Sequence, residues 1–449
     1  MSRSARARVL AAPGFALAIA MAAAVALQDF SGALPLGLFN EGRETYAWLA
    51  RASLAVALAL AGIFGFELAR GRATPLGGAA RGLLASLVLL ELLVTAVDVL
   101  VVSPSGATGP ALGGPYREAV SPAGTRVFLK RAHPGSPLGF RTPVPDEKQP
   151  GAPRILFLGD SYTEGSGRDA ACNYPEVATA ALNAARAARG EPPFVAMNAG
   201  VAGYGPEESL ALLRFLREEG YAFDAVVLSI FVENDFSDDL PGTERRVVAG
   251  INFRFPRSPF LRWLHPLNSR TARYAMFLWQ AARMGRADDA VQRGDGNCRP
   301  PPPLPDPLPE ELRDLVLRRY ASNYGPEPQL AMQSVADALA GLRAEAAQAG
   351  VRLAIVVFPD RIVADREIRA RVGLSLDLDR RNELAKLRAF VAEQAGDTPV
   401  LDTTETLTDG SVNYRSSDTH LSDVGNQVAG KYVGEQLAER LRSGAGGAP

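Results

Sequence analysis

The hydrophobic residues of this chain form two patterns. Three long apolar stretches cover about residues 9–27, 46–68 and 83–102. A helix that spans a membrane needs roughly 20 mostly apolar residues, so these stretches predict about three transmembrane helices within residues 1–103. From residue 154 onward, short apolar runs alternate with helix-like segments. That alternation predicts an α/β domain with a parallel sheet.

The first apolar stretch has two interpretations. Arg3, Arg6 and Arg8 precede it, and residues 24–26 (Ala-Val-Ala) resemble a cleavage site. A signal peptide that is cleaved is therefore one interpretation. The stretch is longer than the apolar part of most signal peptides, which favours a retained helix.

Charged residues in the loops predict the orientation. Arginines precede the first stretch, and Arg70, Arg72 and Arg81 lie between the second and third stretches. The loop after the first stretch instead carries the acids Asp29, Glu41 and Glu44. Basic loops stay in the cytoplasm. We therefore expect a multi-pass protein of the cell (inner) membrane, in contact with the lipid bilayer, whose part after about residue 103 is extracytoplasmic or periplasmic.

Two acids interrupt the third stretch. Glu91 and Asp98 lie seven residues apart and therefore on one face of the expected helix. Acids inside a membrane are usually buried against partners. Asp98 is close to the expected boundary and can reach water, so only Glu91, with Arg51 as its suggested partner, is a candidate for a role.

The soluble part begins with a Gly- and Pro-rich lead-in, residues 104–153. The expected strands and helices then follow one another: strands at 154–158, 194–197, 225–232, 351–358 and 399–402, and helices at 174–189, from 206, at 330–349, at 380–394 and up to about 441. Five strands that alternate with helices predict a three-layer αβα domain over residues 154–443. Residues 240–328 lack this alternation, and we expect an inserted, partly helical subdomain that covers the site.

Composition excludes several classes of function. Basic and acidic residues nearly cancel, at 48 against 49, so the charge gives no indication of nucleic-acid binding. The arginines and aromatics of residues 253–279 have two interpretations, a nucleic-acid patch or a membrane-surface contact, and the expected compartment disfavours the first. The sequence has no dense Cys/His cluster and no Walker-type loop, so we expect neither a metal nor another cofactor.

A serine follows the first strand of the domain directly. The run 154–158 ends in Gly159, Asp160 and Ser161, which places Ser161 at the carboxyl end of a parallel strand, where α/β sheets bind their ligands. A helix that starts there favours developing negative charge. Ser161 is therefore a candidate nucleophile. The alternative is that Asp160 and Ser161 only cap a helix.

Histidine is rare in this chain. His133 lies in the lead-in and His265 in the insertion, and only His420 falls where a polar loop at the same sheet edge is expected. A serine nucleophile needs a base that works near neutral pH. Asp418, two residues earlier, is close enough to orient that imidazole.

Two further residues are candidates for stabilising an oxyanion. Gly203 has a backbone N–H that no side chain obstructs, and Asn234 has a side-chain amide. The alternatives are an ordinary turn glycine and an ordinary Asn-Asp turn. Asp160 and Asp235, which neighbour two of these candidates, are possible accessory residues.

These features occur in one order along the chain. Residues 159–161 (Gly-Asp-Ser), 198–203 (Asn-Ala-Gly-Val-Ala-Gly), 234–235 (Asn-Asp) and 418–420 (Asp-Thr-His) resemble the four blocks of the SGNH or GDSL-type hydrolases. The resemblance covers about residues 154–441. It implies a flavodoxin-like three-layer fold, Ser161 as nucleophile, His420 as base and Asp418 as its partner. It also implies Ser161 N–H, Gly203 and Asn234 as oxyanion donors.

The chain departs from that pattern twice. Val232 stands where many members have glycine, and one residue separates Asp418 from His420 where many have two. The shorter spacing looks like the variant in periplasmic polysaccharide O-acetyltransferases. We therefore expect an acylhydrolase that cleaves carboxylic, for example acetyl, esters through an acyl-Ser161 intermediate. The alternatives are an O-acyltransferase that modifies a cell-surface glycan and a membrane-anchored binding protein with a relic site.

Cys172 and Cys298 are the only cysteines. In an oxidising compartment they can pair and hold the insertion over the site. Sequence alone also allows two free thiols, because pairing requires Cα atoms within about 7 Å of each other.

Overall fold

The computed structural model divides the chain into two compact units. One contains Met1–Arg117 and Gly242–Gly285, and the other contains Glu118–Pro241 and Arg286–Pro449. The structure describes residues 5, 9, 11–16, 42–97, 116–130, 138–140, 152–165, 170–232, 234–238, 243–248, 251–257, 298–310, 312–314, 316–317, 327–373, 378–408 and 411–441.

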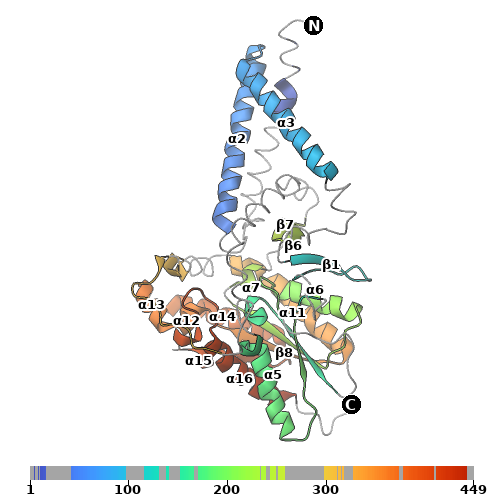
Figure 1. The fold of residues 1–449 in the computed structure, drawn as a ribbon, viewed down its shortest axis with the longest axis vertical. Helices are drawn as coiled ribbons and strands as arrows, with labels where there is room; N and C mark the ends of the chain where they lie inside the picture. The colour runs from blue at the N-terminus through green and yellow to red at the C-terminus, as the bar shows by residue number, and fades with distance from the viewer. Residues whose placement is uncertain are drawn as a thin grey trace. The chain divides into compact units, whose positions relative to one another are not determined.

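Two long helices dominate the first unit (Figure 1). They are α2 (Gly42–Arg70) and α3 (Pro75–Val97). In the described part of the chain, only α3 is long and apolar enough to cross a membrane, over Pro75–Ala96 with a mean hydropathy of 1.8. Its leucines are largely exposed in the structure. The expected number of three spans stays a prediction, since most of the first apolar stretch lies outside the described residues.

The start of α3 differs from the expectation of a helix from about residue 83. Pro75 occupies the first turn, where its missing N–H costs nothing. Glu67, which is fully buried, accepts hydrogen bonds from the backbone and hydroxyl of Thr74 and pairs with Arg81 Nη1 at 2.6 Å. These contacts from α2 stabilise a turn of α3 that the apolar pattern alone did not predict. The suggested Glu91–Arg51 pair cannot be placed, because the Arg51 side chain lies outside the described residues.

The second unit is built on a five-stranded sheet. Its strands, in spatial order, are β4 (Val195–Asn198), β3 (Arg154–Leu158), β5 (Ala225–Phe231), β8 (Arg352–Phe358) and β9 (Val400–Asp402). Every neighbouring pair is parallel, with Phe157 opposite Asn198 and Leu158 opposite Leu228. In chain order the strands are arranged 2-1-3-4-5, the flavodoxin-like order. The expected parallel α/β sheet is confirmed.

Helices cover both faces of this sheet. On one face, α5 (Tyr174–Ala187) and α16 (Asp423–Arg440) pack with alternate residues of the strands into the main hydrophobic core. A Cβ on Gly434 of α16 would lie 2.3 Å from the carbonyl oxygen of Ala178 in α5, so glycine permits this close approach. On the other face lie α6 (Pro206–Glu218), α11 (Glu327–Ala349) and α14 (Leu378–Ala395).

The described residues also contain two antiparallel strand pairs that are not part of the five-stranded sheet. In the lead-in, β1 (Tyr116–Val120) pairs with β2 (Arg126–Lys130), and in the insertion, β6 (Thr243–Val248) pairs with β7 (Ile251–Pro256). The hydrophobic pattern of the sequence predicts neither pair. The aromatic part of the insertion after residue 257 lies outside the described residues, so the partly helical lid stays a prediction.

Candidate active site

The turn after β3 presents Ser161 at the carboxyl end of that strand. Gly159 has a φ of +148°, and a Cβ there would lie 2.4 Å from Thr163 Oγ1, so the turn requires glycine. Asp160 is the N-cap of α4 (Ser161–Glu164), because its Oδ1 accepts a hydrogen bond from Tyr162 N at 2.9 Å. The capping interpretation therefore describes Asp160, while the Ser161 side chain makes a contact outside the turn.

That contact is with His420. The Nε2 atom of His420 lies 2.9 Å from Ser161 Oγ, across 259 residues of sequence. The other ring nitrogen, Nδ1, lies 3.2 Å from Asp418 Oδ1. His420 and Asp418 are 24% and 29% exposed, so the three side chains form a chain of hydrogen bonds that solvent and a substrate can reach.

Several bonds hold the 418–420 loop in this position. His420 N donates to Asp418 Oδ1 at 2.9 Å, which closes a tight local turn. Tyr162 OH, next to the serine, donates to the carbonyl oxygen of Thr419 at 2.6 Å. The loop that carries the imidazole is thereby bonded directly to the helix that carries the hydroxyl.

Two arginines that the sequence analysis did not single out support the same loop. Arg361, in α12 (Arg361–Ala364), is fully buried, and its Nη1 donates to the carbonyl oxygens of Arg415 and Asp418. Arg415 Nη1 lies 3.3 Å from Asp418 Oδ2. The only sequence signal for Arg361 is its place after the carboxyl end of β8, the edge where the other site residues lie.

These neighbours determine the ionisation of Asp418. Burial raises the pKa of its carboxyl group, but the hydrogen bond with His420 and the positive charge of Arg415 outweigh burial and hold the pKa well below its ordinary value of 3.8. Asp418 is therefore a carboxylate at neutral pH. An ionised carboxylate on Nδ1 fixes the tautomer in which Nε2 accepts a proton from the serine.

The glycine loop after β4 packs against the nucleophile turn. Ala199 N and Val201 N donate to the carbonyl oxygens of Phe157 and Gly159 at 2.9 and 3.0 Å. A Cβ on Gly200 would lie 2.3 Å from Glu164 N, so this close approach also needs glycine. Gly203 has a φ of +78°, a left-handed conformation that glycine adopts without strain.

Asn234 and Asp235 follow β5 at the same edge of the sheet. Asn234 N donates to the carbonyl oxygen of Phe231 at 3.3 Å, and Asp235 Oδ2 accepts from Phe231 N at 2.9 Å. The ring of Phe231 stacks on that of Tyr162 at 4.0 Å between centroids. Asp235 is 1% exposed, so its carboxylate closes the turn that positions Asn234.

The two cysteines form a disulfide. Cys172 and Cys298 are bonded with their Cα atoms 5.4 Å apart, which is the first of the two alternatives that the sequence left open. Arg299 N donates to Asp423 Oδ2 at 3.0 Å in the first turn of α16, just after His420. Residues 298–299 of the insertion are therefore attached near the 418–420 loop. His133 and His265 lie outside the described residues.

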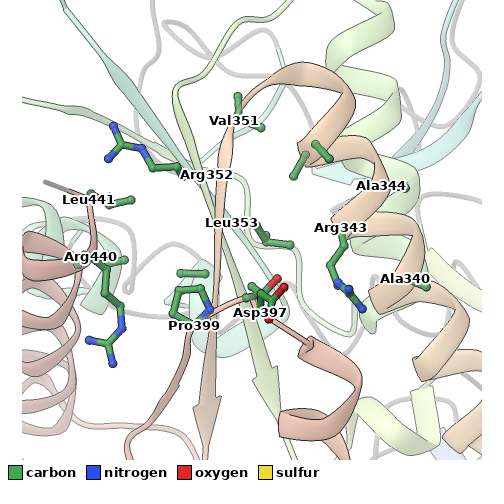
Figure 2. Close-up of a pocket in the computed structure, with 15 residues that line it drawn as sticks. Ala340, Arg343, Ala344, Val351, Arg352, Leu353, Asp397, Pro399, Arg440 and Leu441 are labelled. Atoms are coloured by element: carbon green, nitrogen blue, oxygen red, sulfur yellow. The ribbon is translucent and has the colours of Figure 1, made fainter. Parts of the chain in front are cut away.

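A pocket lies at the opposite edge of the sheet (Figure 2). It is bordered by the amino end of β8, at Arg352 and Leu353, by Arg343 of α11 and by Arg440 of α16. The last residue of β8 that lines the pocket is Ala354, four residue steps before Phe358 at the carboxyl end, roughly 13 Å at about 3.3 Å per residue. The pocket therefore takes no part in the chemistry of Ser161. Among the described residues, no group of three or more His, Cys, Asp or Glu side chains could hold a metal ion.

No family model matches the chain, and no curated protein matches it. Solved structures give distant similarities. The lipase/acylhydrolase from Enterococcus faecalis is 16% identical, over 64% of this chain and 96% of that one, with a TM-score of 0.30. A member of the lipolytic protein G-D-S-L family from Veillonella parvula DSM 2008 is 12% identical, over 64% and 100%, with a TM-score of 0.29.

An acetyl xylan esterase, AlAXEase, is 11% identical, over 63% of this chain and 99% of that one, with a TM-score of 0.31. TM-scores at this level carry no argument about function.

Proposed function

We propose that the chain is a serine esterase of the SGNH type, an acylhydrolase that cleaves carboxylic esters. The observation that carries the proposal is the chain of contacts from Ser161 Oγ to His420 Nε2 and from His420 Nδ1 to Asp418. His420 takes the proton of Ser161 as the hydroxyl attacks the ester carbonyl. Asp418 stabilises the imidazolium that forms.

The reaction has two half-reactions. In the first, Ser161 Oγ bonds to the carbonyl carbon, and collapse of the tetrahedral intermediate breaks the ester bond. The alcohol leaves with the proton that His420 held. In the second, water gives its proton to His420 and attacks the acyl-Ser161 ester, which releases the acid and restores the serine hydroxyl. The backbone N–H groups of Ser161 and Gly203 and the Asn234 amide stabilise the oxyanion in both.

The enzyme is proposed to act outside the cytoplasm, anchored in the cell membrane by its amino-terminal helices. Two observations support this location. The apolar helix α3 exposes most of its leucines, among them Leu83, Leu89 and Leu92 at 54%, 66% and 61%. The Cys172–Cys298 disulfide favours an oxidising compartment.

An O-acyltransferase is the second candidate. The one-residue spacing between Asp418 and His420 favours it, as does a membrane anchor beside a cell-surface glycan. The two reactions share the acyl-Ser161 intermediate and differ in the group that removes the acyl chain, water or a sugar hydroxyl.

The test follows the acyl group. Full-length protein in detergent receives a small activated acetyl ester with and without cell-surface glycan, and free acetate and acetylated sugar are quantified. The proposal expects free acetate as the main product in both samples and no activity in Ser161→Ala. Acetyl transfer mainly to sugar, despite the large excess of water, would establish the transferase. Full hydrolysis by Ser161→Ala would refute both.

A further inference from the structure

The proposed oxyanion donor Gly203 lies between two residues that both bond outside their own loop. Ala202 N donates to Glu164 Oε2 at 2.7 Å. Tyr204 OH donates to the carbonyl oxygen of Phe128 in β2. Gly203 itself has a positive φ, and the direction of its N–H depends on how the peptide units on either side are held.

Glu164 is an unusual acceptor for this purpose. Its side chain is 2% exposed, although it is a carboxylate in the helix of the nucleophile. Burying an unpaired carboxylate is costly. Here Lys130, at the end of β2, forms an ion pair with Glu164 Oε1 and leaves Oε2 for Ala202.

The antiparallel pair β1–β2, a hairpin, also holds Tyr204, the other neighbour of Gly203. The rings of Phe128 and Tyr204 meet edge to face with centroids 4.5 Å apart, and the two residues are 4% and 1% exposed. Residues 126–130 of the lead-in therefore contact both sides of the loop. They precede the first strand of the parallel sheet, so this support comes from outside the α/β domain itself.

We infer that Lys130 and Glu164 are positioning residues of the proposed esterase, which direct the Gly203 N–H toward the oxyanion. The inference rests on the proposed function. In the transition state the oxyanion gains from a donor that is already aimed at it. Loss of the ion pair releases Ala202, and the adjacent Gly203 then loses its fixed direction, while Ser161, His420 and Asp418 keep their contacts.

A second attachment of the hairpin supplies a matched control. Thr125 Oγ1 donates to Glu218 Oε1 at 2.8 Å, at the end of α6. Thr125→Val removes this hairpin contact and leaves Lys130, Glu164 and Ala202 unchanged. A general loosening of the hairpin would therefore appear in Thr125→Val as well.

The experiment compares full-length Lys130→Met, Glu164→Gln, Lys130→Arg, Thr125→Val and Ser161→Ala. For each variant, kcat and KM for a small activated ester, the rate of labelling by a fluorophosphonate and the melting temperature are measured. Loss of one oxyanion donor costs on the order of 10²-fold in kcat. We expect losses of about that size in Lys130→Met and Glu164→Gln, with KM nearly unchanged and slower labelling, and a double variant no worse than either.

The control variants distinguish failure of the positioning role from failure of the proposed esterase function. Lys130→Arg is expected to recover most of kcat. Thr125→Val is expected to keep kcat within about 2-fold of that of the unmodified protein, a much smaller change than the loss of on the order of 10²-fold expected when an oxyanion donor is lost. If Lys130→Met and Glu164→Gln keep kcat and lose only thermal stability while Ser161→Ala is inactive, the positioning role is wrong and the esterase stands. If Ser161→Ala is active, the proposed function fails first.

Discussion

Arg361 donates a hydrogen bond from Nη1 to the backbone carbonyl oxygen of Asp418, 57 residues further along the chain. The same guanidinium bonds Asp365 Oδ2 through Nε at 3.1 Å, and both side chains are fully buried. The proposed acid of the site is thus connected to a buried ion pair beyond the end of β8. We therefore expect a substitution at this point to affect both the stability of the fold and the proposed catalysis.

Arg361→Met is expected to lower both the free energy of unfolding and kcat. It leaves Asp365 as a buried carboxylate without its cation, which costs about 3–5 kcal/mol in the free energy of unfolding. Urea unfolding followed by fluorescence measures this change. Arg361→Met/Asp365→Asn is expected to regain most of the stability, because the asparagine oxygen can still accept from Ile368 N as Asp365 Oδ1 does. Equal instability of the single and double variants would contradict the ion-pair explanation.

The nucleophile and base are expected to act as a unit. Ser161→Ala and His420→Ala should each reduce kcat by on the order of 10⁴-fold or more, with the double variant scarcely worse. Neither change removes much packing, so the melting temperature should stay within a few degrees of that of the unmodified protein. Additive losses in the double variant would show that the two residues work independently.

Asp418 gives a prediction for pH. Its pKa in the folded protein is below the ordinary 3.8, so the ionised carboxylate stabilises the folded state above about pH 4, and this contribution is lost as the pH falls through the folded pKa. Asp418→Asn removes it. The difference in unfolding free energy between the two proteins should be constant above about pH 5 and shrink below about pH 4.

The same variant is expected to lose about 10⁴-fold in kcat near neutral pH, because asparagine favours the wrong imidazole tautomer. Stopped assays from about pH 5 to about pH 9 measure this loss, a range above the titration of a carboxylate with a lowered pKa. Asp418 should add no ionisation to the profile of the unmodified protein in that range. An Asp418 carboxyl group that titrates within this range, followed by NMR, would contradict the lowered pKa.

The sheet and the contacts of Ser161 with His420 were accessible from sequence for one physical reason. Buried parallel strands are continuous apolar runs, and each run ended where polar residues began. Since the carboxyl ends of parallel strands share one edge, residues 161, 203, 234 and 420 had to come close to it. No distance was needed to predict that edge.

The supporting residues could not be predicted in the same way. Lys130, Glu164 and Arg361 are charged residues whose roles depend on partners far away in the sequence. The β1–β2 hairpin was also missed, since a two-stranded hairpin is marginal alone and is stabilised by what it packs against. The helix it packs against, α6, begins about 75 residues after β2 in the chain. The sequence near the hairpin therefore does not show this contact, and the β-propensity of its residues alone predicts the strands poorly.

The disulfide provides the last prediction. Cys172 and Cys298 close a loop across 126 residues, and in the chain-entropy account a cross-link of that size stabilises a protein by about 4–5 kcal/mol. Cys172→Ser/Cys298→Ser should therefore lower the melting temperature by several degrees or more. It should also loosen Arg299 from Asp423 beside the 418–420 loop.

Mass spectrometry under non-reducing conditions first establishes the bond in protein isolated from membranes. Arg299→Ala is the matched control, because it keeps both the disulfide and the backbone N–H that bonds Asp423. If mass spectrometry shows the bond in the unmodified protein and Cys172→Ser/Cys298→Ser has the same melting temperature, the disulfide does not stabilise this domain.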